Sequence, residues 1–412
     1  MIGDWRSETG HQSPITSHQN MQFAAANQSG WFGTFKTVAN FLATPWLSFS
    51  LATGGLLLLL RFRRYVFKWW IGFFLLAAEG VVVVIGMRDP NFALIVGKPD
   101  NVPITAMLFV STFVLWLAMV QAVNNDRRAK QKLPPDEKES SHQKTWVWPD
   151  LLYIEFIALI ICSVVLILWA IYLRAPLEQP ANPAATPNPS KAPWYFLGLQ
   201  EMLVYYDPWY AGVVLPTIIV IGLCAIPYID INPKGNGYFT FAERKWAITV
   251  FLFGYLALWV FMIITGTFLR GPGWNFFGPF EYWDPHKVVA LNNNNLSDYV
   301  WIVWLKKGLP EVKNKVPQLI PPDWASIHAF LVEVGHAIKR EFAGILFLAF
   351  YFLAMPGILA KTFLKKFYQQ MDFGRYSVMV LLFLTMFTLP LKMVLRWTIN
   401  LKYFVDTPWI KF

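Results

Sequence analysis

Long apolar runs separated by short polar stretches dominate this chain. Each run has about 20 residues, the length that crosses the hydrocarbon core of a bilayer. Because lipid offers no hydrogen-bond partner to an unpaired backbone, each run is expected to be a helix. The pattern therefore predicts an all-α, polytopic integral membrane protein with about eight transmembrane helices. The runs lie near residues 38–60, 66–87, 103–123, 151–173, 211–229, 246–269, 342–363 and 376–394.

The composition agrees with a bilayer protein and decides how the net charge is interpreted. Hydrophobic residues make up 56% of the chain and charged residues only 15%, whereas about a quarter of the residues in soluble domains are charged. The formal net charge of +10 would suit a nucleic-acid partner, but most Lys and Arg residues fall between the apolar runs. We therefore expect membrane lipids around the chain and no nucleic acid.

Lys and Arg are unequally shared between the two sets of alternating connections. One set holds 17 of them and the other holds nine. The richer set is expected in the cytoplasm, and the poorer set, with the loop at 174–210, on the outer side. Residues 1–30 lack the apolar stretch of a signal peptide, so the first run is expected to direct insertion. The richer set is 61–68, 124–149, 230–245 and 361–375; the poorer set is 1–37, 88–102, 174–210 and 395–412.

Changes in composition divide the chain into five parts. Pro134-Pro135 lies in a charged stretch typical of a solvated linker. Aromatic residues cluster from Trp274 to Trp283, where we expect either a platform at headgroup level or a docking surface for a partner. The parts are an N-terminal extension with three transmembrane helices (1–125), a charged cytoplasmic linker (126–149), a three-helix domain around the loop at 174–210 (150–270), an outer-face aromatic segment with an amphipathic helix (271–341) and two C-terminal transmembrane helices (342–412).

The most specific motif surrounds the loop between the fourth and fifth runs. Trp148-Pro149-Asp150-Leu151-Leu152-Tyr153 comes before it, the loop contains Pro180-Ala181-Asn182-Pro183 and Thr186-Pro187, and Pro193-Trp194-Tyr195-Phe196 ends it. This order and spacing resemble the quinol-site loop of the cytochrome b family. The resemblance covers roughly residues 146 to 270. It is closest to subunit IV, the separate carboxyl-terminal half of cytochrome b in the cytochrome bc and b6f complexes.

The resemblance implies a subunit of a bacterial quinol:cytochrome c oxidoreductase that is not catalytic alone. Quinol would be oxidised on the periplasmic side of the cytoplasmic (inner) membrane, in respiratory or photosynthetic electron transport. The implied partners are a haem-binding, b6-like subunit, a Rieske iron–sulfur protein and a c-type cytochrome, in a dimeric complex. Haem b, haem c and the [2Fe-2S] centre are expected on those partner subunits.

The histidines explain why the haems are expected elsewhere. Family members bind two b haems through four histidines on two membrane helices, whereas every histidine here lies outside the apolar runs. The chain also lacks a Cys-x-x-Cys-His motif for covalent haem attachment. We therefore expect it to bind no haem by the usual ligands and no other metal. The six histidines are His11, His18, His142, His286, His328 and His336.

Pro193 departs from the family, which has at this position a glutamate thought to accept a proton from quinol. A replacement base must reach the quinol hydroxyl directly or through one water. Glu201 is the leading candidate, although it could equally meet water or a lysine at the outer interface. Pro193 and the aromatic residues Trp194, Tyr195 and Phe196 are expected to bind the flat quinol ring, with core packing as the alternative.

Three further carboxylates are candidates for proton relay. Glu79 lies within an apolar run, where it would either conduct protons or bond a helix of a neighbouring subunit. Asp150 and Glu155 open the fourth run on the cytoplasmic side, the end near the family's quinone-reduction site. Asp150 is equally well explained as a helix cap.

Two other functions stay open at this point. The proline at 193 leaves room for a quinone-reactive membrane anchor of a different multisubunit redox complex. A transporter is the third possibility and ranks far behind. It would need broken helices with polar groups converging in mid-membrane, and apart from Glu79 the apolar runs offer few.

Overall fold

The fold is helical, as the apolar runs predict. A computed structural model describes residues 30–141, 144–173, 175, 180–184, 186–231, 239–289, 292–310 and 322–412, with side chains from 327 onward in the last range. In these ranges seven helices are long and apolar enough to cross a membrane, or up to eight if a bent pair counts as one span. One small parallel sheet joins β1 (Asn294–Asn295) to β2 (Leu401–Tyr403). The expected all-α polytopic fold is confirmed.

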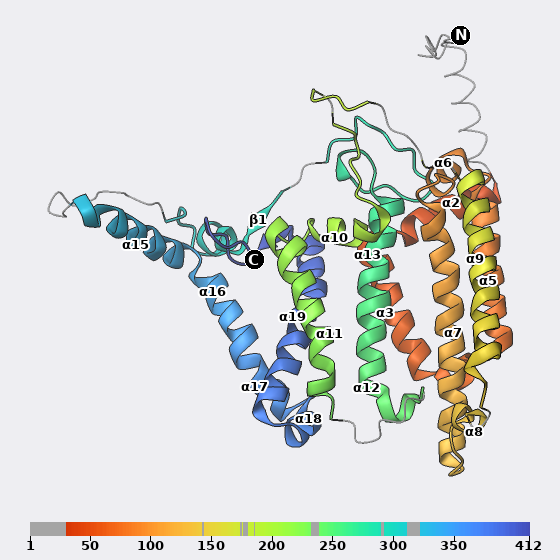
Figure 1. The fold of residues 1–412 in the computed structure, drawn as a ribbon. Helices are drawn as coiled ribbons and strands as arrows, with labels where there is room; N and C mark the ends of the chain where they lie inside the picture. The colour runs from red at the N-terminus through yellow and green to blue at the C-terminus, as the bar shows by residue number, and fades with distance from the viewer. Residues whose placement is uncertain are drawn as a thin grey trace, which may run out of the picture.

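The candidate spans stand side by side in Figure 1 and follow the expected runs closely. Several are continuous helices in which a π-helical turn interrupts the α-helical hydrogen bonding. The spans are α5 (Trp69–Gly86), α7 (Val102–Lys130), η1 with α9 (Val147–Leu151 and Leu152–Tyr172), η3 with α11 (Tyr210–Val214 and Leu215–Ile229), α12 to η5 (Phe241–Leu252, η4 Phe253–Val260, α13 Phe261–Ile264 and Thr265–Leu269), α16 to α17 (Phe342–Ala349, η8 Phe350–Ala354 and Met355–Lys361) and α19 (Phe373–Ile399).

The first apolar run is the exception, because the single helix expected over 38–60 is broken. Here α2 (Trp31–Leu42) and α3 (Pro45–Arg61) meet at a bend of 81°. Pro45 occupies the first position of α3, and Thr44 before it has ψ of 135°. A proline disfavours helical backbone in the residue before it and cannot donate to the preceding turn. The helix that enters the bundle therefore begins at Pro45.

The connections between the spans lie at two opposite ends of the bundle. Figure 1 places α8 (Asp136–Ser140) and α18 (Lys365–Gln370) at the lower end. It places α6 (Pro90–Val96), α10 (Leu197–Met202) and β1 at the upper end. This arrangement matches the alternation of connections expected from the Lys and Arg counts. We call the upper end, which carries the 174–210 loop, the loop end.

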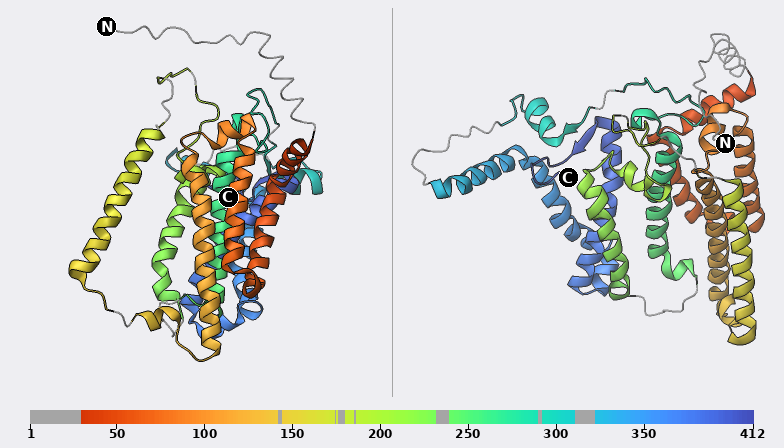
Figure 2. Two further views of the ribbon diagram at one scale, coloured as in Figure 1. Left: turned by 90° about the vertical axis from the view of Figure 1, so that its right-hand side faces the viewer. Right: turned by 45° about the horizontal axis from the view of Figure 1, so that its top comes forward.

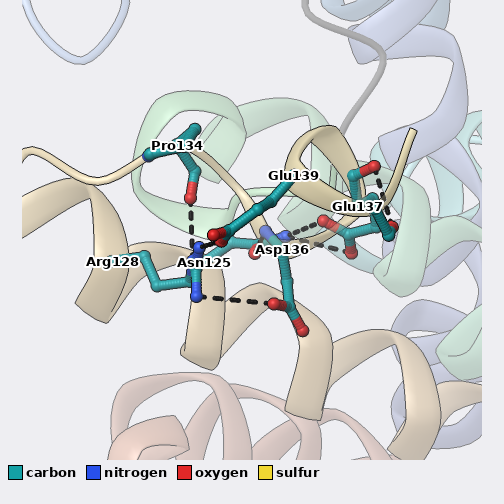
Figure 3. Close-up of polar contacts among 7 residues, drawn as sticks. Asn125, Arg128, Pro134, Asp136, Glu137 and Glu139 are labelled. Atoms are coloured by element: carbon teal, nitrogen blue, oxygen red, sulfur yellow. Dashed lines mark hydrogen bonds and ion pairs between the residues drawn. The ribbon is translucent and has the colours of Figure 1, made fainter. Parts of the chain in front are cut away.

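The linker expected at 126–149 begins inside α7 and folds back on that helix. Figure 3 shows the end of α7 holding the segment that follows it. The Asn125 side chain donates to the Glu137 carboxylate at 2.8 and 3.1 Å, and Arg128 Nε donates to the Pro134 carbonyl at 2.7 Å. Arg128 also pairs with Asp136 at 3.4 Å. This part of the linker is therefore ordered by side chains of the preceding helix.

The main core lies between α3, α7, α12 to η5 and α19. Aromatic rings from three of these segments meet there, with Phe49 lying 5.5 Å from Phe261 and 5.8 Å from Trp397 between ring centroids. Tyr205 and Tyr206, just after α10, are fully buried in the same core. The segment that follows α10 is therefore anchored on a packed scaffold.

The span formed by η1 and α9 is separate from this core. All its residues, 147–172, are exposed, and the left view of Figure 2 shows α9 standing apart from the other helices. An apolar helix in a bilayer contacts lipid or other helices. Because its own chain leaves this span uncovered, both of its faces are available to another subunit or to lipid.

Candidate functional site

The motif at 193–196 forms a short turn that leads directly into α10. The Pro193 carbonyl accepts the N–H of Phe196 at 2.8 Å, which starts the 3₁₀ turn η2 (Trp194–Phe196). Pro193 is the N-cap residue of this turn, with φ of −52° and ψ of 149°, and its ring holds φ near that value. Pro193 thus shapes the backbone that displays the three aromatic residues.

The three aromatic side chains point away from the core of their own chain. Trp194, Tyr195 and Phe196 are 40%, 51% and 51% exposed. Their rings contact one another, with centroids 5.6 Å apart for Trp194 and Tyr195 and 4.7 Å apart for Tyr195 and Phe196. These side chains are therefore not packed in the core of their own chain, which was the alternative raised above. We call these three residues the aromatic surface.

Glu201 lies within α10 and is buried in the protein interior. Its residue is 1% exposed, and Arg270 binds both carboxylate oxygens, with Nη2 to Oε1 at 2.7 Å and Nε to Oε2 at 3.0 Å. The indole N–H of Trp274 donates to Oε2 at 3.2 Å, and the Tyr205 hydroxyl lies 3.4 Å from Oε1. Among the described residues, the ion-pair partner of Glu201 is therefore an arginine of the same chain.

This placement separates Glu201 from the aromatic surface. Both carboxylate oxygens already accept hydrogen bonds, so an incoming proton would have to displace one of them. The ion pair instead joins α10 to the residue that follows η5. Such bidentate arginine–carboxylate pairs fix orientation strongly. The structure therefore supports a positioning role for Glu201, while its role as proton acceptor stays a prediction.

A second set of contacts holds the loop before Pro193 against the same end of the α12 to η5 span. Lys191 Nζ donates to the Thr267 carbonyl at 2.7 Å and lies 4.6 Å from the centroid of the Trp283 ring. The Gly273 N–H donates to Asn188 Oδ1 at 2.6 Å. Burial, together with the charge of Lys98, lowers the pKa of Lys191 to about 7.

The other candidate carboxylates lie elsewhere. Glu79 Oε1 accepts the Thr112 hydroxyl at 2.7 Å and so joins α5 to α7. Within its own chain, Glu79 therefore bonds the neighbouring helix α7. Asp150 lies inside the turn η1 and Glu155 in the first turn of α9. Both belong to the separate span, at the end opposite the aromatic surface (Figure 1).

Sequence reasoning missed Arg270 and Trp274, the two partners that fix Glu201. Arg270 is separated from Glu201 by 69 residues, and Trp274 by 73. The available signal was a single arginine directly after an apolar run, followed by Gly271-Pro272-Gly273. A cation at such a border is ordinarily explained by the membrane interface, so the contact was not predictable from the pattern.

The residues present do not fit a b-type haem. No candidate span contains a histidine. His328 and His336 lie on α15 (Pro322–Arg340), which is outside the candidate spans, and His286 follows the aromatic segment. Eight residues on a helix separate two side chains by about 12 Å along the axis, so this pair cannot ligate one iron. We derive no step through a haem held by this chain.

The loop, the aromatic surface and the helices behind them define a membrane-embedded helical domain of a recognisable class. Residues 180–269 match the family described as cytochrome b(C-terminal)/b6/petD. A cytochrome b of Allochromatium vinosum is 33% identical over 92 residues, which are 21% of this chain and 22% of that protein. The chain thus matches about a fifth of the length of this curated relative. No solved structure matches the chain.

Residues 180–269 therefore form a cytochrome b C-terminal-like domain within a multi-pass membrane protein. The matched segment contains the aromatic surface, Glu201, α11 and the α12 to η5 span. It begins after α9, so the Trp148-Pro149 motif lies outside it, although the expected resemblance began near residue 146. The first three spans and the last two are additions to the matched domain.

Proposed function

We propose that this chain is a haem-free, cytochrome b-type subunit of a bacterial quinol:cytochrome c oxidoreductase. In this proposal Trp194, Tyr195 and Phe196 form one wall of the quinol-oxidation site. The observation that carries it is the exposure of these three rings at the start of a cytochrome b-like domain. Adjacent aromatic rings bind a flat apolar ligand well.

The opposite wall would come from another chain. Because the aromatic surface has no covering segment among the described residues, a pocket requires a partner. The uncovered α9 supplies a second, independent surface for such a partner. We assign this position to a haem-bearing, b6-like subunit, beside a Rieske protein and a c-type cytochrome. Those partners would take the two electrons of the quinol through their b haems and [2Fe-2S] centre.

The side chains of the aromatic surface have distinct polar abilities. The Trp194 indole can only donate a hydrogen bond, and Phe196 has no polar atom, but the Tyr195 hydroxyl both donates and accepts. Tyr195 is therefore the residue of this surface that can hold a quinol oxygen and pass its proton to water. In this proposal Glu201 positions α10, and Pro193, which replaces the family's glutamate, gives the backbone its turn.

Quinol oxidation by membranes carrying variant chains tests the proposal. We expect Trp194→Ala to lower the rate of quinol-dependent cytochrome c reduction about tenfold, equivalent to about 1.4 kcal/mol. Trp209→Ala is the matched control, because Trp209 is also exposed, at 66%, and begins the next helix at the same end. Tyr195→Phe should keep quinol affinity and lower the maximal rate. Wild-type rates in both Trp194→Ala and Tyr195→Phe would refute the assignment.

The proline at 193 also favours one alternative, a quinone-reactive anchor of a different redox complex. Without the family's glutamate, the site lacks the usual proton acceptor. The alternative predicts that Trp194→Ala lowers quinone reactivity in membranes whose purified complex contains no b-type haem and no Rieske protein. Both functions predict an effect of Trp194→Ala, so the content of the purified complex distinguishes them.

A further inference from the structure

A cavity of about 460 Å³ lies at the loop end, where segments far apart in the sequence meet. Its walls come from the loop before η2, the end of α10, the turn after Arg270, and the end of α19 with β2. Leu203 and Val204 line it together with three cations, Arg270, Arg396 and Lys402. A volume of this size suits a small ligand or a lipid headgroup.

Among the residues that the structure describes, only one of the three cations has an acidic partner. Arg270 is paired with Glu201 at 2.7 Å. Arg396 donates to two carbonyls, of Asn292 and Asn400, at 3.0 and 3.1 Å, and to Asn293 Oδ1 at 2.7 Å, all uncharged acceptors. Within the described part of the chain, neither Arg396 nor Lys402 forms an ion pair. The three cations carry three positive charges, and Glu201 offsets one of them, so the cavity wall keeps a net charge of +2.

The two cations without an acidic partner among the described residues lie close together in a poorly solvated wall. Arg396 is only 7% exposed, so water screens its guanidinium poorly. Burial, and then the charge of Arg396, lower the pKa of Lys402, while Asp207 acts in the opposite direction. The Asp207 carboxylate accepts the N–H of Trp209 at 3.1 Å and makes no ion pair with Lys402. Like charges gathered in a cleft attract an anion.

We propose that this cavity binds a phosphate-bearing anion, with Arg396 and Lys402 as its cationic contacts. Guanidinium groups suit phosphate because they present several donors in one plane and keep their charge. The asparagines that surround Arg396 orient that plane. Leu203 and Val204 would contact the apolar part of a lipid, and the cavity lies where the membrane helix α19 ends. The ligand is therefore the headgroup of an anionic phospholipid or a free phosphate.

Binding to the purified full-length protein, in its native complex and stripped of lipid, tests this assignment. Dioleoyl phosphatidylglycerol, dioleoyl phosphatidylcholine and radiolabelled inorganic phosphate are the probes. We expect Lys402→Gln to weaken binding of the anionic probe about tenfold, as for the loss of one charge-assisted hydrogen bond. Arg396→Lys, which keeps the charge but not the plane, should weaken it less than Arg396→Gln. Lys98→Gln is the control, because Lys98 is exposed just after α6, a helix of the loop end, and pairs with Asp100 at 3.1 Å.

The three outcomes are distinct. A lipid site is supported if phosphatidylglycerol binding depends on Lys402 and Arg396 and if inorganic phosphate does not displace the lipid. Phosphate binding with the same dependence, without lipid selectivity, supports a site for a free anion. The proposal would be overturned if Lys402→Gln, Lys98→Gln and the unsubstituted protein bound phosphatidylglycerol equally well and also bound inorganic phosphate equally well. The measurement does not involve quinol, so this proposal and the proposed function can fail separately.

Discussion

The ion pair between Glu201 and Arg270 should be one of the most sensitive points of the domain. Its side chains are 1% and 11% exposed, so replacing Glu201 by Gln leaves a buried guanidinium without a counter-charge. Removing one partner of a buried pair costs about 3–5 kcal/mol. The Arg270 Nη1 bond to the Trp274 carbonyl, at 3.1 Å, survives the substitution, which places the expected cost toward the lower end of that range.

Thermal unfolding of the purified protein in one detergent, followed by tryptophan fluorescence, measures this cost. Glu201→Gln and Arg270→Gln should each lower the midpoint temperature by several degrees, and the double variant by less than the sum. Asp100→Asn is the control, because its ion pair with Lys98 is half exposed and worth at most about 1 kcal/mol. If Glu201→Gln were as stable as Asp100→Asn, the buried pair would not anchor α10 as described.

Two further predictions concern Lys191 and a close helix contact. The pKa of Lys191 falls from 10.5 to about 7 on folding, so between these pH values the unfolded chain binds more protons and stability rises with pH. The midpoint temperature should therefore rise more steeply from pH 7 to 9.5 in the unsubstituted protein than in Lys191→Met. Equal slopes would contradict this. A Cβ on Gly344 would collide with the Phe404 carbonyl, whereas Gly357 has open space around it. Gly344→Ala should therefore lower the midpoint temperature and Gly357→Ala should not. A lower midpoint temperature for Gly357→Ala than for Gly344→Ala would refute the contact.

Much of the fold could be predicted because lipid imposes a simple rule on the sequence. Seven of the eight apolar runs correspond to continuous candidate spans, whose ends differ from those expected by up to seven residues, at Lys130. The first run failed because the apolar pattern continues through Pro45, while the backbone cannot. The aromatic motif was also found from sequence, since its residues are adjacent along the chain.

The interior of the site could not be predicted in the same way. Glu201 meets Arg270 only because α10 and the end of η5 pack together, and no local pattern encodes that contact across 69 residues. The separation of α9 is similar, because an apolar helix has the same sequence pattern whether it packs inside its own chain or against another. Tertiary packing therefore decided both findings.

The measurement that tests the central claim most directly is a redox difference spectrum of the complex purified through a tag on this chain, with identification of the proteins that accompany it. Our account predicts that a b-type haem and a Rieske protein purify with the chain, and that quinone analogues oxidise the reduced complex. A colourless chain purified alone, from membranes that oxidise quinol normally without it, would contradict the account.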